Sequence, residues 1–384
     1  MLYDYIQITD KEKMADENSD QWSIINLTDF FDNKDVDLSK YDIAIIGVNE
    51  DRGSSQNKGT CDAPDIIRKA LYKLKSPSKN IEIIDMGNIQ KGSSIKDTYF
   101  ALKSILSELI NEGIFTIILG GGQDLSFAQF NAYEKLNKSV NFVSIDERLD
   151  LDASMPDNQK FLMDVFTKEN NHLFNFTNIG HQSYYVHDDI VASMEKMNFD
   201  CYRLGHFKNN ITETEIILRD ADMISFDFNA VKCSDAPARA NASPNGFYSE
   251  DICQIARYAG ISDKISSFGL YEMNPSLDIN GQTAQLAGQI IWYILEGYYN
   301  RHFENPKKEN KEYLRFVVDL KSDEYNMVFW KSKKSGRWWM EVPFSNMKQN
   351  HERHHLVSCS YQDYQDACKG EIPNRWVNAY EKLC

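Results

Sequence analysis

The sequence lacks the features that direct a chain into a membrane, onto a nucleic acid or out of the cell. No run of about 18 apolar residues is present that could cross a bilayer. The formal net charge of −15 disfavours a nucleic-acid partner, because phosphate binding needs a basic surface. The opening segment has neither the basic stretch nor the apolar core of a signal peptide. We therefore expect a cytoplasmic protein with no membrane or nucleic-acid partner.

Clusters of the usual transition-metal ligands are also scarce. The seven cysteines follow no zinc or redox spacing, so we expect free cysteines in a reducing compartment, each packed as a small apolar side chain. His351, His354 and His355 form the one dense histidine cluster. No acid or cysteine at a suitable spacing completes a metal site there, so we expect a solvated loop.

Apolar runs of strand length alternate with segments of helical periodicity. Runs buried on both faces are typical of a parallel sheet, and the alternation predicts an α/β chain. The expected strands are 43–48, 81–85, 114–119, 140–145, 174–180, 223–228 and 265–272, and the expected helices are 62–74, 94–113, 189–197, 250–260 and 282–300.

The pattern changes near residue 302, after a charged stretch that resembles a linker. Short apolar segments follow, with residues 333–336 suited to a hairpin turn and Trp338 and Trp339 suited to packing on that hairpin. We divide the chain into an N-terminal segment (1–40), an α/β domain (41–301) and a small C-terminal extension of β-hairpin and helix (302–384).

Three loops that follow expected strands are unusually polar. They are GGGQDLS (120–126), DERLD (146–150) and DFN (227–229). Ligands of open α/β sheets bind beyond the carboxyl ends of the strands, which is where these loops lie. Their oxygen atoms could bind a metal ion, or the acids could cap helices and pair with Arg148. The pattern alone leaves both readings open.

Five motifs in order resemble those of the ureohydrolases, which comprise arginase, agmatinase and formimidoylglutamase. They are GTCDAPDIIR (59–68), GGGQDLS (120–126), DERLD (146–150), SFDFN (225–229), and EMNP (272–275) followed by TAQLA (283–287). The resemblance covers roughly residues 40–300 and implies a three-layer α/β/α sandwich with a mainly parallel sheet. It also implies a homo-oligomer, a trimer or hexamer.

The resemblance further implies a two-manganese centre with six protein ligands, whose bridging water attacks a guanidinium or formimino carbon. Only Asp146, Asp150 and Asp227 keep the family's residue type, while the other three positions hold Gln123, Arg148 and Asn229. An arginine offers no lone pair to a metal. We therefore expect a vestigial site without metal, which also includes Asp124, and in which Arg148 lies among the aspartates and replaces the ions. The alternative is manganese or another divalent cation on the three aspartates.

Three residues are candidates for substrate binding. By the resemblance, Glu272 occupies the place that holds a substrate guanidinium, and Asp235 opens a loop that flanks the site. His181 follows an expected strand near the mouth of the site.

Two functions remain open. The first is a non-catalytic protein of ureohydrolase fold with a binding, structural or regulatory role, whose extension supports assembly or a protein partner. The alternative is a formimidoylglutamase-like, metal-dependent hydrolase of C–N bonds in linear amidines or guanidines.

Overall fold

The computed structural model describes residues 2–32, 36–78, 80–136, 138–152, 154–304, 306, 311–320, 326–344 and 353–384. Its first ten strands are β1 (Ile6–Gln7), β2 (Thr28–Phe30), β3 (Ile43–Val48), β4 (Ile83–Ile89), β5 (Phe115–Leu119), β6 (Val140–Ile145), β7 (Leu173–His181), β8 (Asp200–Arg203), β9 (Met223–Asp227) and β10 (Ser267–Tyr271). The α-helices in the same part of the chain are α1 (Lys11–Met14), α2 (Ala63–Leu71), α3 (Ile95–Asn111), α4 (Leu125–Asn131), α5 (Phe161–Phe166), α6 (Asp188–Lys196), α7 (Leu204–Phe207), α8 (Glu213–Asp220), α9 (Ser249–Ile261) and α10 (Gln282–Tyr299).

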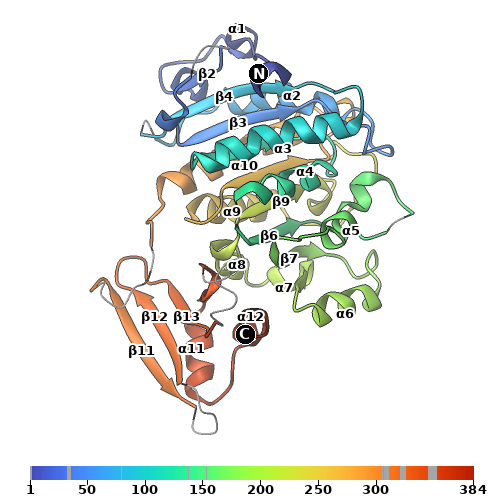
Figure 1. Ribbon diagram of the computed structural model, residues 1–384. Helices are drawn as coiled ribbons and strands as arrows, with labels where there is room; N and C mark the ends of the chain where they lie inside the picture. Colours follow the sequence, from blue (N-terminus) through green and yellow to red (C-terminus); the bar gives the residue numbers. More distant parts are fainter. Residues whose placement is uncertain are drawn as a thin grey trace.

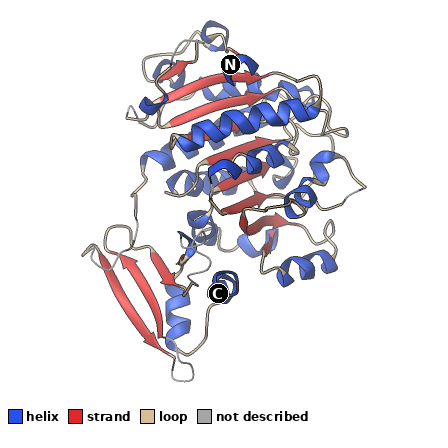
Figure 2. Ribbon diagram, viewed as in Figure 1, coloured by secondary structure: helices blue, strands red, loops and turns tan. Residues whose placement is uncertain are grey.

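These strands form one 10-stranded sheet in the order β1-β4-β3-β5-β10-β9-β6-β7-β8, with β2 also paired to β4. Its ladders are parallel except for β1 against β4. Helices cover the sheet, with α3, α4 and α5 in front of it in Figure 1 and the strands shown in red in Figure 2. The predicted mainly parallel sheet is confirmed.

Both faces of the sheet are buried under helices. Along β3, Ile43 and Ile45 join the core cluster that contains residues of α2, α9 and α10, whereas Ala44 and Ile46 join the cluster that contains residues of α3 and α4. Successive side chains of a strand point to opposite faces, so a run of apolar residues serves both layers at once. The predicted three-layer α/β/α sandwich is confirmed.

The strand β4 runs four residues beyond its predicted end at residue 85. Asp85 is buried within it, and Arg68 of α2 donates to the two Asp85 oxygens at 2.7 and 2.9 Å. Gly87 then takes a φ of +86°, which suits glycine. In a sequence, an acid followed by a glycine indicates the end of a strand. Here the ion pair with Arg68 stabilises Asp85 inside the sheet, so β4 continues past it.

The C-terminal part forms a second, 4-stranded antiparallel sheet in the order β11-β12-β13-β14. It consists of β11 (Tyr313–Asp319), β12 (Asn326–Ser332), β13 (Trp338–Glu341) and β14 (Leu356–Cys359), followed by α11 (Tyr361–Cys368) and α12 (Asn374–Leu383). The hairpin turn before Arg337 is confirmed, with Gly336 at a φ of +76°. Trp338 and Trp339 are buried, which confirms the packed hairpin. The extension contains a 4-stranded sheet and the helices α11 and α12, where a β-hairpin and helix were predicted. The exact limits of the three predicted segments of the chain stay a prediction.

The structure corrects part of the expectation for histidine and cysteine. His351 lies outside the described residues. His354 is buried and stacks on Phe174 with 4.0 Å between ring centroids, so it is not in a solvated loop. Among the cysteines, which are all free, Cys368 and Cys384 are exposed rather than packed in a core. No helix in the described ranges is long and apolar enough to cross a membrane.

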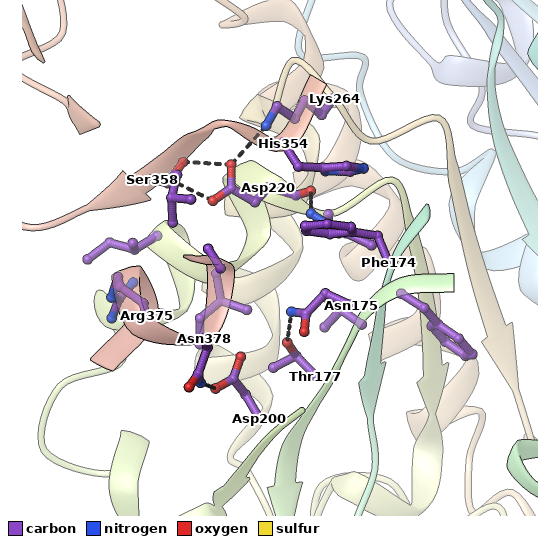
Figure 3. A pocket seen from close by; sticks show the side chains of 18 of the residues that line it. Phe174, Asn175, Thr177, Asp200, Asp220, Lys264, His354, Ser358, Arg375 and Asn378 are labelled. Atoms are coloured by element: carbon purple, nitrogen blue, oxygen red, sulfur yellow. Dashed lines mark hydrogen bonds and ion pairs between the residues drawn. The ribbon is translucent and has the colours of Figure 1, made fainter. Parts of the chain in front are cut away.

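The extension contacts the large sheet across a polar junction that surrounds a cavity of about 80 Å³ (Figure 3). Asp220 accepts hydrogen bonds from Lys264 at 2.9 Å and from the backbone N–H of Ser358 at 2.8 Å. Asn378 of α12 donates to Asp200 at 3.2 Å. Lys382, one turn further along α12, donates to Asn175 of β7. These polar contacts flank an apolar cluster in which Phe174 of β7 packs with Ala379 and Leu383 of α12.

We expect Arg68→Met to lower the free energy of unfolding by about 3–5 kcal/mol, because it leaves Asp85 buried without its ion-pair partner. Urea unfolding followed by circular dichroism measures the effect, and Lys69→Met, a change at the exposed neighbour, serves as the control. A loss no larger than that of the control would contradict the role of the pair.

Lys382 makes the stability of the protein depend on pH. Burial lowers the pKa of Lys382 to about 8, whereas a lysine in an unfolded chain titrates near about 10.4. Between these values the unfolded chain binds a proton that the folded chain does not, so stability rises with increasing pH. We expect this rise in urea midpoints measured from about pH 8 to about pH 10, and its loss in Lys382→Met. Parallel pH profiles of the two proteins would contradict the assignment.

Candidate functional site

The loops that follow five neighbouring strands meet at one edge of the large sheet. The strands are β3, β5, β10, β9 and β6, which lie side by side in that order. The carboxyl ends of parallel strands share an edge, so polar side chains that follow them converge. The three polar loops identified in the sequence all belong to this set, as predicted.

A cavity of about 120 Å³ lies between these loops. We call it the acidic cavity. Its lining includes the sequence-predicted residues Asp146, Arg148, Asp150, Asp227, Asn229 and Glu272, together with Glu147, Asn158 and Arg239. Gln56, Ala240 and Asn241 also line it and are exposed, so the cavity reaches solvent between them. Of the remaining candidates, Gln123, Asp124, Asp235 and His181 are not part of the lining.

Glu272 follows β10 and has a φ of +67°, a left-handed conformation that is uncommon for a residue with a side chain. Its carboxylate is buried and accepts hydrogen bonds from four groups of the protein. They are Ser54 Oγ at 2.5 Å, Asn57 Nδ2 at 2.9 Å, the Gln123 backbone N–H at 2.9 Å and Asn158 Nδ2 at 3.2 Å. These bonds hold the strained backbone in place and occupy both carboxylate oxygens.

Asp227 ends β9 and is bound by the residue two positions after it. The Asn229 backbone N–H donates to Asp227 Oδ1 at 2.6 Å, and Asn229 Nδ2 donates to Oδ2 at 3.2 Å. The amide of Asn229 therefore turns its NH2 group toward the carboxylate. Burial and the charge of Asp146 raise the pKa of Asp227 well above its usual range.

Asp146 and Asp150 share a hydrogen bond between their carboxyl groups. Burial raises the pKa of Asp146 to about 6, and it raises the pKa of Asp150 further with the help of the Asp146 charge. A proton held between the two carboxyl groups relieves their mutual repulsion. Asp150 Oδ2 is left without a hydrogen-bond partner among the described residues.

The loop after β5 lies beside the acidic cavity without lining it, and the Gln123 side chain hydrogen-bonds Asp146. Gln123 Nε2 donates to Ser225 Oγ at 3.4 Å, and Tyr99 of α3 donates to Asp124 Oδ2 at 2.6 Å. Asp124 packs so tightly that a Cβ on Gly53 or Gly122 would lie 2.2 Å from its carboxyl group, so both positions need glycine. Asp124 therefore lies beneath the loop rather than beside the three aspartates.

The expectation that Arg148 lies among the aspartates is wrong. Its guanidinium stacks on Tyr185, with 3.8 Å from Cζ to the ring centroid, and its Nε lies 3.6 Å from Glu147 Oε1. The side chain remains 37% exposed. Only its backbone N–H binds Asp146, at 3.1 Å. Stacking on an aromatic face suits the weakly hydrated guanidinium, which explains why it turns to the cavity mouth.

Arg239 is the buried cation that the sequence reading missed. It lines the cavity, is only 3% exposed, and donates to the backbone carbonyls of Phe228 and Val231. Asp227 and Glu147 are the acids whose charges favour its protonated form. The available signal was a lone arginine in the Pro/Ala/Ser-rich loop from Asp235 to Gly246.

Asp235 and His181 lie outside the cavity. Asp235 accepts from the backbone N–H of Ser249 at 2.9 Å, next to the start of α9, and pairs with Lys232 at 3.4 Å. His181 ends β7, is buried, and lines a separate open groove beside β8. In the ranges that the structure describes, no three His, Cys, Asp or Glu side chains are arranged to hold a metal ion.

The sequence model of the arginase family matches residues 41–296. A curated relative, formimidoylglutamase of Staphylococcus haemolyticus strain JCSC1435, is 23% identical over 280 residues, which span 67% of this chain and 86% of that protein. Formimidoylglutamase of Staphylococcus aureus strain MRSA252 is 25% identical over 279 residues, which span 68% of this chain and 90% of that protein.

A solved structure has a similar fold. It is formiminoglutamase of Trypanosoma cruzi with manganese, which aligns with a TM-score of 0.64 at 18% identity and covers 70% of this chain and 97% of that one. The large domain is thus shared over nearly the full length of the neighbour.

We expect Arg239→Met to lower the free energy of unfolding by about 3 kcal/mol, because it leaves the buried Phe228 and Val231 carbonyls without their donor and removes the positive charge nearest Asp227 and Glu147. Arg148→Met is the matched change at the half-exposed arginine, and it should cost less than about 1 kcal/mol. Chemical unfolding of the two variants beside the wild type measures both values. A larger loss for Arg148→Met would show that Arg148, not Arg239, balances the acids.

Proposed function

The chain belongs to the arginase family, and on this basis we propose that it is a formimidoylglutamase-like member without hydrolytic activity. The proposal rests on one observation: hydrogen-bond donors of the chain itself already bind acids of the site. A binding or regulatory role then replaces catalysis.

Glu272 is the first support. By the family resemblance it is the carboxylate that would hold a substrate guanidinium, yet Ser54, Asn57, Gln123 and Asn158 already donate to it. Hydrogen bonds to a charged group contribute about 1.5–3 kcal/mol each, so a ligand would have to displace several such bonds. Glu272 is therefore better suited to fixing the loops than to binding a cation.

The donor set at the metal positions is the second support. Manganese is bound well by carboxylates and imidazole, and this set contains no imidazole. The NH2 groups of Gln123 and Asn229 donate to Ser225 and Asp227, and Arg148 offers no lone pair. The six positions therefore do not fit a two-manganese centre.

Charge balance is the third support. Two dications would normally offset the repulsion among the acids of such a site. Here Arg239 supplies a fixed positive charge beside Asp227 and Glu147, and Asp146 and Asp150 share a proton. The positive charge that we first expected from Arg148 comes from Arg239 instead.

The alternative function, a metal-dependent hydrolase of linear amidine or guanidine C–N bonds, also has one observation in its favour. Asp146, Asp150 and Asp227 line one cavity, and Asp150 Oδ2 has no partner among the described residues. A single residual cation on these oxygens would be manganese or another divalent ion.

Assembly and location complete the proposal. The family resemblance supports a homo-oligomer, a trimer or hexamer, and the unpatterned cysteines support a cytoplasmic location. The extension offers a surface for a protein partner at β11, an outer strand of its sheet on which Leu314 is 41% and Val317 50% exposed.

Metal content separates the two functions. We expect protein purified with added manganese to contain far less than one manganese, zinc or iron per chain by elemental analysis, because the site lacks suitable ligands. Near-stoichiometric metal that is lost in Asp146→Ala would contradict the proposal and support the hydrolase.

Restoring the family's metal-ligand residues should increase metal binding. We expect Gln123→His, Arg148→His and Asn229→Asp together to raise manganese affinity at least about tenfold, since they supply two imidazoles and a carboxylate. Gln159→His, which adds a histidine to the cavity wall at none of the ligand positions, is the control.

A further inference from the structure

Among the described strands of the extension, one edge of the sheet is bound by the large domain and the other is open. At β14, the backbone N–H of Ser358 donates to the Asp220 carboxylate at 2.8 Å, and the carbonyl of Cys359 accepts from Arg219 at 3.2 Å. At the opposite edge, β11 pairs with β12 alone and lies on the side of the extension away from the large sheet (Figure 1). An open edge is a template on which another strand can pair.

The backbone groups of every second residue of β11 face this open edge. At the end of the β11–β12 ladder, the backbone N–H of Lys333 donates to the carbonyl of Glu312 at 2.9 Å. Hydrogen-bonded pairs alternate along an antiparallel ladder, so the even-numbered residues of β11 bind β12 through their backbone. The odd-numbered residues Arg315, Val317 and Asp319 therefore direct their backbone N–H and C=O groups outward.

The sequence of β11 does not block pairing at this edge. The strand has 7 residues, contains neither proline nor lysine, and pairs with β12 without a bulge over its described length. Leu314 and Val317 are exposed apolar residues on it. Arg315 and Asp319 are exposed as well, and the Arg315 guanidinium lies 5.9 Å from the ring centroid of Trp330. The edge thus presents apolar side chains and one charge of each sign to another chain.

We propose that β11 pairs antiparallel with β11 of a second copy of this chain, about a two-fold axis that passes through Val317. In this register Val317 lies opposite Val317 of the second copy. Arg315 lies opposite Asp319 of the second copy, and by symmetry Asp319 lies opposite its Arg315. The outward backbone groups of these residues then exchange hydrogen bonds, and the two 4-stranded sheets become one continuous sheet.

The charges select both the partner and the register. Opposite charges directly across an antiparallel pair stabilise it, and like charges destabilise it. Moving the axis by one residue, to Phe316, would place Arg315 opposite Val317 and leave its charge unpaired. A two-fold contact of this kind is closed, so it gives a pair of chains rather than a fibre.

This inference rests on the partner surface of the proposed function and names its occupant. It does not depend on the acidic cavity. The strand β11 also lies outside residues 41–296, which match the arginase family, so the contact is additional to any assembly of the large domain. Metal content tests the proposed lack of activity, and particle mass tests this contact, so the failure of one is distinguishable from the failure of the other.

A charge exchange tests the pairing by sedimentation velocity of the full chain over about 1–100 μM. We expect an even number of chains in the wild-type particle. Arg315→Asp should raise the dissociation constant at least about tenfold, because like charges then face each other at both ends. Adding Asp319→Arg to that variant restores opposite charges and should restore the wild-type mass. Both variants lose the contact of Arg315 with Trp330, so recovery in the double variant reports the pairing alone.

Two results of the charge exchange would overturn the inference. One is a wild type with an odd number of chains over the whole range, a monomer included, which would leave the edge to a different protein. The other is a double variant that assembles no better than Arg315→Asp.

A cysteine crosslink tests the position of the axis. Residues opposite each other in a hydrogen-bonded antiparallel pair have Cα atoms about 5.5 Å apart, which suits a disulfide. We expect Val317→Cys to form a covalent dimer under mild oxidation. Leu314→Cys, on the same strand and also exposed, is the matched control, because Leu314 lies opposite Leu320 of the second copy in this register.

The wild type measures the background from its own exposed cysteines, Cys368 and Cys384. Leu314→Cys should not crosslink above this background. Equal crosslinking of the two variants, or none above the wild type in Val317→Cys, would overturn the inference.

Discussion

The carboxylate of Glu272 holds the loops of the site together. It accepts from Ser54 and Asn57 after β3, from Gln123 after β5, and from Asn158 in the segment after β6. A left-handed φ of +67° persists there because these bonds determine the conformation from three directions. Glu272 therefore links the loops that follow β3, β5 and β6.

Once Glu272 is engaged in this way, the remaining acids need compensation from elsewhere. Asn229 binds Asp227 through its backbone and side-chain N–H groups. Arg239 contributes the permanent positive charge, and its burial keeps that charge unscreened beside Asp227 and Glu147. The cavity is therefore organised by hydrogen bonds and charges of the chain itself.

The sequence predicted the fold well where apolar pattern decides the structure. The strands β3 and β6 begin and end where the apolar runs do, because both faces of each are buried. Tertiary contacts determine the features that the apolar pattern did not predict. The extent of β4 depends on the distant partner of Asp85, and the direction of Arg148 depends on Tyr185, which is far away in the chain. The motif order located the site loops, but spacing could not show that Arg239 enters the cavity from another loop.

We propose that the acids of this cavity are balanced by groups of the protein and not by metal ions. An anomalous difference map from a crystal of the protein grown with excess manganese tests this charge balance. We expect no anomalous peak between Asp146, Asp150 and Asp227, with the guanidinium of Arg239 ordered near Asp227. Two strong peaks among the three aspartates would contradict it.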